Sequence, residues 1–233
     1  MKNRSLDKTG NKQAVDNFLT QVKNTPLKTQ TPSSGRLIFA LDATASRQAT
    51  WDQACQLQSE MFVQAQQLNG LSIQLCYYRG FNEFYASHWL NDSNQLLQQM
   101  NQVSCAGGYT QIARLLQHAL KETQQKKVNA LAFIGDCVEE DVDKLCNLAG
   151  QAGIMGLPLF IFQEGYDVAA QTCFQQMANL SQGAYARFDQ NSAAQLSALI
   201  QAVAIFSSGG RSAFKNHLLR HPNLAKQLTH QIS

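Results

Sequence analysis

The sequence predicts one doubly wound α/β domain, built on a mainly parallel six-stranded sheet with one antiparallel edge strand. Residues 36–42 (RLIFALD) form an unbroken apolar run, which is typical of a parallel strand buried on both faces. Strand-like and helix-like segments then alternate as far as residue 206, which favours helices on both faces of the sheet. Two strand-like segments are separated by about three residues around Gly80, too few for a crossover, so these strands must pair antiparallel.

Three regions follow from the order of these segments. Residues 1–35 contain an amphipathic helix at 13–24 and a linker rich in Pro, Ser and Thr at 25–35. We expect the α/β domain to occupy residues 36–207. Residues 208–233 form a basic tail whose leucines are spaced for a helix.

The periodicity of the domain predicts strands and helices of ordinary length. Strands are expected at 36–42, 71–80, 83–90, 128–134, 157–162 and 184–188, and helices at 50–68, 94–103, 110–125, 142–152, 169–180 and 192–206. If the strands at 71–90 extend the sheet on one side of the first strand, the strand at 128–134 must lie on its other side. The order of the strands would then reverse between these two neighbours, where open α/β sheets bind ligands.

Composition and charge exclude several classes of protein. Apolar residues make up 44% of the chain and charged residues 15%, which is ordinary for a globular protein. No apolar run is long enough to cross a bilayer, and the first residues lack the apolar core of a signal peptide, so we expect a cytoplasmic protein without a membrane partner. Residues 36–210 carry nine basic and fourteen acidic side chains, which argues against nucleic-acid binding by the folded domain.

Three loops carry oxygen-bearing side chains to the same predicted edge of the sheet. Asp42, Thr44 and Ser46 follow the first strand, Thr110 ends the segment GGYT at the start of a helix, and Asp136 ends the strand at 128–134. Because parallel strands end at one edge, we expect these carboxylates and hydroxyls to converge. An all-oxygen site suits Mg²⁺, with Mn²⁺ or Ca²⁺ as alternatives.

These residues resemble the metal-ion-dependent adhesion site (MIDAS) of the von Willebrand factor A (VWA) domain family. The family's DxSxS motif matches Asp42, Thr44 and Ser46, with threonine replacing the middle serine, and its separate threonine and distal aspartate match Thr110 and Asp136. The resemblance covers residues 36–206. It implies a non-catalytic module in which a bound divalent cation grips an acidic residue of a protein partner. Intracellular members often act beside AAA+ ATPases or in multi-component assemblies, so the resemblance implies such a partner here.

Two other functions stay open from the sequence. One is a Mg²⁺-dependent phosphatase resembling the haloacid-dehalogenase fold, with Asp42 as the nucleophile and Lys121, Lys126 or Lys127 as its lysine. Against it, a helix is expected soon after Asp42 where that family has a β-hairpin. The other is an interaction scaffold with a vestigial metal site, in which the basic ends bind the partner.

Helix capping is the plainer explanation for some of the same polar residues. Asp and Ser before a helix are common N-caps, so Asp42 and Ser46 could serve only that purpose. The acidic residues at 139, 140, 141 and 143 are interpreted as the first turn of their own helix, favoured there by its dipole.

Overall fold

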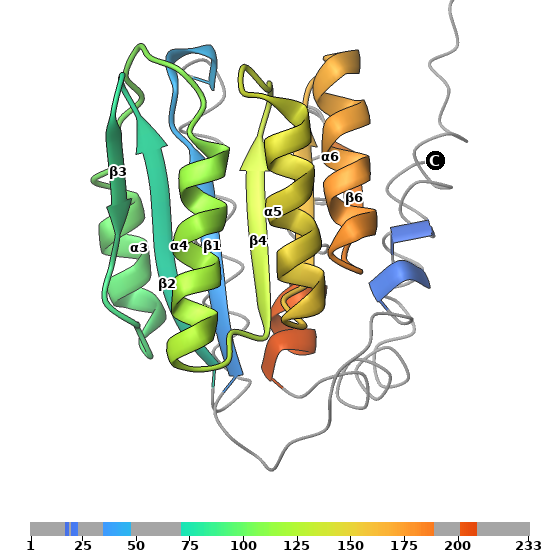
Figure 1. Ribbon diagram of the computed structural model, residues 1–233. Coiled ribbons are helices and arrows are strands. Elements are labelled where there is room, and N and C mark those ends of the chain that lie inside the picture. Colours follow the sequence, from blue (N-terminus) through green and yellow to red (C-terminus); the bar gives the residue numbers. More distant parts are fainter. Residues whose placement is uncertain (1–16, 19, 23–34, 48–70, 189–200, 209–233) are drawn as a thin grey trace, which may run out of the picture.

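A computed structural model describes residues 17–18, 20–22, 35–47, 71–188 and 201–208. Its centre is a six-stranded sheet in the order β3-β2-β1-β4-β5-β6 (Figure 1). The strands are β1 (Gly35–Asp42), β2 (Leu71–Arg79), β3 (Glu83–Ala86), β4 (Ala130–Gly135), β5 (Leu159–Glu164) and β6 (Ala184–Phe188). All neighbours are parallel except β2 and β3. The predicted fold class, the antiparallel edge strand and the reversal of strand order between β1 and β4 are confirmed.

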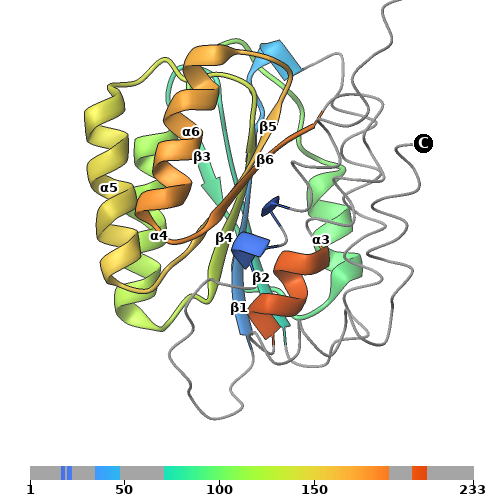
Figure 2. The ribbon, with the colours of Figure 1, turned by 90° about the vertical axis from the view of Figure 1, so that its right-hand side faces the viewer.

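Helices cover both faces of the sheet, as a doubly wound fold requires. The helices α4 (Ile112–Gln125), α5 (Val142–Ile154) and α6 (Val168–Leu180) lie on one face, and α3 (Ser93–Met100) lies on the other with the helical residues 201–208 (Figure 2). Successive side chains of β1 alternate between the two layers. Leu37, Phe39 and Leu41 belong to the core beneath α3, whereas Ile38 and Ala40 belong to the core beneath α4, α5 and α6.

The described part of the predicted N-terminal helix packs onto the sheet. Residues 17, 18 and 20–22 are helical, and Phe18 and Val22 are fully buried. The ring of Phe18 lies 5.5 Å from that of Phe162 and 6.1 Å from that of Phe160, measured between centroids. The rest of residues 1–34, the predicted helix at 50–68 and the basic tail beyond residue 208 lie outside the described residues.

Three predicted element boundaries differ from the structure in informative ways. The strand expected at 83–90 ends at Ala86, although an isolated bridge still joins Leu90 to Ile73. The helix expected from Thr110 begins at Ile112, with Gln111 at its N-cap. The strand expected at 157–162 runs from Leu159 to Glu164, so it reaches two residues closer to the edge that carries the site. The remaining described elements start or end within three residues of their predicted limits.

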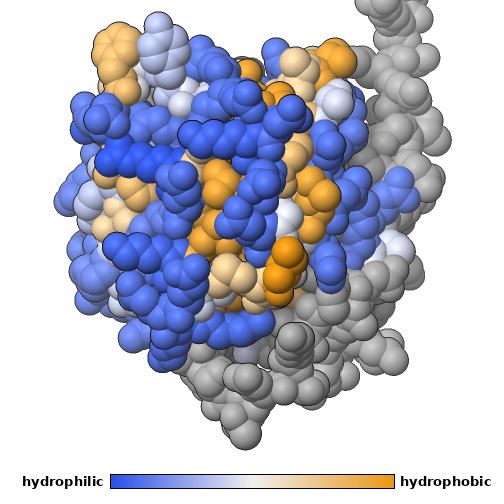
Figure 3. Space-filling view, viewed as in Figure 1, coloured by the Kyte–Doolittle hydropathy of each residue, from blue (hydrophilic) through white to orange (hydrophobic). Residues whose placement is uncertain are grey.

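The outer surface of α4, α5 and α6 is mostly hydrophilic, with hydrophobic residues showing between the helices (Figure 3). Ile154 and Val168 are the most exposed apolar side chains of α5 and α6. Within the described ranges, the fold contains no helix long and apolar enough to cross a membrane.

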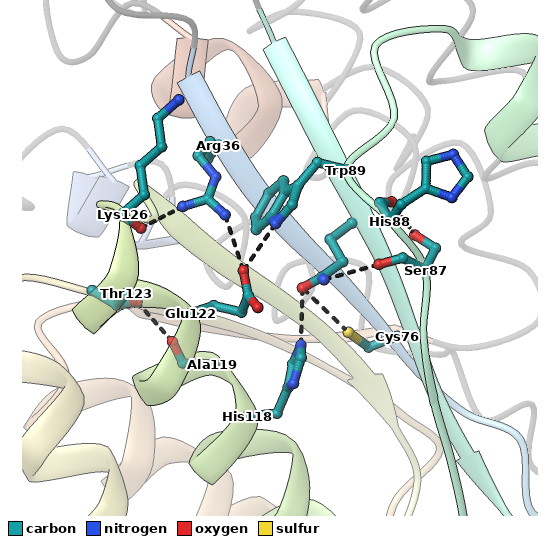
Figure 4. Close-up of polar contacts among 11 residues, drawn as sticks. Arg36, Cys76, Ser87, His88, Trp89, His118, Ala119, Glu122, Thr123 and Lys126 are labelled. Carbon is teal, nitrogen blue, oxygen red and sulfur yellow. Dashed lines mark hydrogen bonds and ion pairs between the residues drawn. The ribbon is translucent and has the colours of Figure 1, made fainter.

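A partly buried polar cluster ties α4 to the start of β1, at the edge of the sheet opposite Asp42 (Figure 4). Glu122 accepts hydrogen bonds from the Arg36 guanidinium at 3.0 Å and from the Trp89 indole at 2.9 Å. The guanidinium also stacks 3.7 Å from the centroid of the Trp89 ring and donates to the backbone carbonyl of Lys126. Burial lowers the pKa of Arg36, and the neighbouring Glu122 carboxylate opposes that shift.

Candidate metal centre

The five predicted site residues stand on the three loops at the carboxyl edge of β1 and β4. Asp42 is the last residue of β1, Thr44 and Ser46 follow it, and Asp136 comes directly after β4. Thr110 lies on the loop before α4, and this loop crosses over the end of β1. The crossing is fixed by an isolated bridge between Thr44 and Ala106, with the Ala106 amide donating to the Ala43 carbonyl at 3.0 Å.

Asp42 is fully buried and organises the loop that follows it. Its Oδ1 accepts from the Thr44 amide at 2.8 Å and from the Thr44 hydroxyl at 2.6 Å. Its Oδ2 accepts from the Tyr78 hydroxyl at 2.9 Å. Burial raises the pKa of the Asp42 carboxyl, the hydrogen bonds from Thr44 oppose that shift, and the nearby Asp136 carboxylate adds to it. Asp42 therefore ionises at some cost in free energy, which a bound cation would offset.

The hydroxyls of Thr44 and Ser46 form a chain that starts at Asp42. Thr44 Oγ1 donates its single proton to Asp42, so the 3.1 Å contact between Thr44 Oγ1 and Ser46 Oγ must use the Ser46 proton. Both hydroxyl oxygens then keep lone pairs for another ligand. Thr44 is buried and Ser46 is exposed, so the chain runs from the protein interior to the surface.

Asp136 and Cys137 bring further ligand atoms close to Asp42. One carboxylate oxygen of Asp42, one of Asp136 and the Sγ of Cys137 all lie within 4.8 Å of one another. The Oδ1 of Asp136 is buried, and no donor within the described residues reaches it. Burial raises the pKa of the Cys137 thiol to about 12, and the charges of Asp136, Asp42 and Glu139 and a hydrogen bond to the Asp136 side chain add to that shift. The loop after β4 thus presents an unsatisfied buried acceptor beside a thiol.

Thr110 is held by the loop after β4 instead of capping its own helix. Its amide donates to the Glu139 carboxylate at 2.9 Å, and its Oγ1 accepts from the Glu139 amide at 3.1 Å. The Glu140 carboxylate accepts from the amides of Ile112 and Ala113 and so caps α4 from outside. These contacts join the second and third loops of the predicted site.

The interpretation of all four acidic residues as one helix turn is therefore wrong for Glu139 and Glu140. The helix α5 begins at Val142, Asp141 is its N-cap, and only Asp143 stands in its first turn. Glu139 and Glu140 precede the helix and reach the neighbouring loop, since four backbone N–H groups at the start of α4 lack helical partners.

A close backbone contact fixes the Thr110 loop against the β2–β3 turn. A Cβ added to Gly108 would lie 1.8 Å from the carbonyl oxygen of Gly80, so only glycine fits there. Gly80 itself has a φ of +60°, a conformation that glycine adopts without strain. The next residues along each segment, Tyr109 and Phe81, are exposed, and their rings meet edge to face at 5.7 Å.

A buried ion pair supports the site from the β5 side. Arg47 is only 1% exposed, its Nε donates to the Glu164 carboxylate at 2.9 Å, and an Nη donates to the Asp42 backbone carbonyl at 2.8 Å. This side chain ties the end of β1 to the end of β5. It fixes the direction in which the chain leaves Asp42.

Sequence reasoning did not assign roles at the site to Tyr78, Cys137 or Arg47. Each is adjacent to a predicted feature: Cys137 follows Asp136, Arg47 follows Ser46, and Tyr78 pairs in register with Asp42. Cys137 and Arg47 could have been found by examining every polar neighbour of the motif. Tyr78 could not, because its role depends on the register of β1 and β2.

Comparison with solved structures identifies the fold. No protein-family model and no curated protein sequence matches the chain. A von Willebrand factor type A structure from Catenulispora acidiphila superposes with a TM-score of 0.61 at 14% identity, covering 76% of this chain and 43% of that one. The SpRpn10 VWA domain gives a TM-score of 0.55 at 14% identity and covers 75% and 97%. An aerotolerance-related membrane protein from Bacteroides fragilis gives 0.53 at 17% identity and covers 72% and 97%.

Other structures that superpose on this chain come from proteins of different kinds. The human COPII-coat protein Sec24c, for example, superposes with a TM-score of 0.57 at 9% identity, and this chain spans 33% of its length. At such low identities the superpositions establish the fold and no more. The observed strand order, the antiparallel edge strand and these superpositions lead to one conclusion: this chain has the von Willebrand factor A fold.

Proposed function

We propose that this protein is a non-catalytic binding module that holds a divalent cation at the carboxyl edge of β1 and β4 and uses it to grip an acidic residue of a partner protein. The cation would be held by Asp42, Thr44, Ser46, Thr110 and Asp136. The observation that carries the proposal is the buried Oδ1 of Asp136, which no donor among the described residues satisfies, beside the Asp42 carboxylate. An orphaned buried acceptor costs free energy unless a ligand satisfies it.

The donor set suits a cation in two further respects. A carboxylate offers about four lone-pair positions, and Asp42 uses three of them on Thr44 and Tyr78. One position on its Oδ2 stays available. The hydrogen-bond chain from Ser46 through Thr44 leaves hydroxyl lone pairs available as well. Oxygen donors of this kind suit Mg²⁺, Mn²⁺ or Ca²⁺.

The surroundings of the site suit a protein partner. Ser46 is exposed, so a ligand can reach the proposed cation from solvent. Tyr109, next to Thr110, is 60% exposed and packs against Phe81, which is 77% exposed. Exposed aromatic pairs are common at the centres of protein interfaces. A partner carboxylate on the cation would place its neighbouring side chains against these rings. An AAA+ ATPase or another component of a larger assembly is the class of partner that we propose.

The phosphatase alternative fits the geometry less well. A nucleophilic carboxylate must reach its substrate, but Asp42 is fully buried and three hydrogen bonds hold it. The candidate lysines lie on the second half of α4 or just after it, whereas α4 begins at the site. The ammonium group of Lys127 donates a hydrogen bond to the Gly156 carbonyl instead of to a site residue. The vestigial-scaffold alternative predicts binding through the basic ends without any cation.

Selection of peptides from a random library tests directly whether the protein binds a carboxylate through the cation. With the protein immobilised in Mn²⁺, we expect enrichment of peptides containing Asp or Glu, because a carboxylate completes the coordination shell. Their binding should disappear in EDTA and when the acidic residue is changed to its amide. Thr110→Ala should abolish binding, whereas Thr123→Ala, on the far half of α4, should not. Peptides that bind equally well in EDTA, or without an acidic residue, would contradict the proposal.

A further inference from the structure

Cys137 places a sulfur atom beside a proposed metal site whose other ligand atoms are all oxygens. Its Sγ and one carboxylate oxygen each from Asp42 and Asp136 lie within 4.8 Å of one another. An ion about 2.3 Å from sulfur and about 2.1 Å from oxygen separates opposite ligands by at most about 4.4 Å. The three atoms are therefore close enough for one cation to draw them together as ligands with small movements of their side chains.

Two observations support a role for Cys137 as a metal ligand beside Asp136. The cysteine is half-buried and forms no disulfide. Beside it, the buried Oδ1 of Asp136 accepts no hydrogen bond from any residue that the structure describes. A carboxylate oxygen without a donor among these residues can accept a cation, and the thiol shares the same few ångströms of space.

We infer that Cys137 is a ligand of the cation and that the site prefers a thiophilic divalent metal of the zinc class over Mg²⁺. Sulfur ligands select zinc and similar metals, whereas Mg²⁺ takes oxygen ligands almost without exception. Zinc sites that keep one coordination position open accept an external ligand there, and Cys137 would join the oxygen donors proposed above. The inference rests on the proposed function in one respect: the same cation would bind the partner's carboxylate.

Cobalt provides a spectroscopic test, because Co²⁺ takes zinc sites and a thiolate bound to it produces a sulfur-to-metal charge-transfer band. We expect this near-ultraviolet band when the full-length, reduced protein is titrated with Co²⁺, and we expect Zn²⁺ to remove it by competition. Cys137→Ser should abolish the band and still bind Mn²⁺. The preference for Zn²⁺ over Mg²⁺ should fall by roughly 10- to 100-fold, the range that even outer-shell partners of metal ligands contribute.

Control variants separate this inference from the proposed function. Cys105→Ser and Cys146→Ser remove other half-buried thiols and should keep the band. A band that survives in Cys137→Ser would overturn the inference. So would wild-type protein that binds Mn²⁺ but shows no band with Co²⁺, and in that case the metal-dependent grip would stand. Wild-type protein that binds none of Mn²⁺, Zn²⁺ and Co²⁺ would overturn both.

Discussion

We expect the substitution Glu122→Ala to lower the free energy of unfolding by about 3 kcal/mol, the low end of the range for breaking a buried ion pair. The change leaves the buried guanidinium of Arg36 without its carboxylate partner and the Trp89 indole N–H without its acceptor. Only 8% of the Arg36 side chain and 17% of the Glu122 side chain are exposed, so water replaces the lost contacts poorly. Thermal unfolding should show a fall of about 6–12 °C in melting temperature.

Glu83→Ala is the matched control for this prediction. Glu83 also forms an ion pair with an arginine, Arg79, at 2.8 Å, but its side chain is 60% exposed. Exposed pairs typically contribute less than about 1 kcal/mol, so Glu83→Ala should melt close to the wild type. Equal melting temperatures for the two variants would show that the cluster around Glu122 does not clamp α4. Because this cluster lies at the far edge of the sheet, Glu122→Ala should retain the metal affinity of the wild type well below its melting temperature.

Gly108→Ala should weaken metal binding by about tenfold or more, the loss expected when support of a metal ligand is disturbed, and should destabilise the fold by about 1–3 kcal/mol. The added methyl group would sit 1.8 Å from the Gly80 carbonyl oxygen and 2.1 Å from its carbon, both of them backbone atoms that cannot rotate away. The loop must therefore move, and it carries Thr110 two residues later. Calorimetric titration with Mn²⁺ and thermal unfolding measure the two effects.

Gly107→Ala tests whether the steric contact is the cause. A Cβ at Gly107 would meet no atom of the described residues within 4 Å, and its φ is not in the left-handed region. This variant should therefore bind metal and unfold like the wild type. If Gly107→Ala and Gly108→Ala behave alike, the close approach to Gly80 does not position the Thr110 loop.

The sequence was sufficient for the fold and for placing Asp42 and Asp136 at one edge of the sheet, because both follow from regular geometry. The short hairpin around Gly80 fixed β3 as antiparallel, and it placed β4 on the other side of β1. Parallel strands end at one edge, so Asp42 and Asp136 had to be neighbours. No contact between side chains was needed for these conclusions.

The parts that could not be predicted depend on contacts between segments distant in the sequence. Glu139 and Glu140 were assigned to their own helix because a dipole favours acids locally, but the open amides near Thr110 and at the start of α4 attract them instead. Tyr78 sits in a largely apolar strand, so its hydrogen bond to Asp42 depends on strand register. The end of β3 at Ala86 likewise depends on tertiary pairing.

The most direct test of the central claim is the melting temperature of the protein in EDTA and in excess Mg²⁺, Mn²⁺ or Zn²⁺. A cation at a hundredfold excess over Kd stabilises the native state by about 2.7 kcal/mol, so the melting temperature should rise by several degrees. Asp42→Asn keeps the shape and an acceptor oxygen but loses the charge, and this variant should not respond. Asp143→Ala, which removes an exposed acid of α5, should respond like the wild type. A wild-type melting temperature that none of these cations changes, or an equal rise in Asp42→Asn, would contradict a metal-dependent grip at this site.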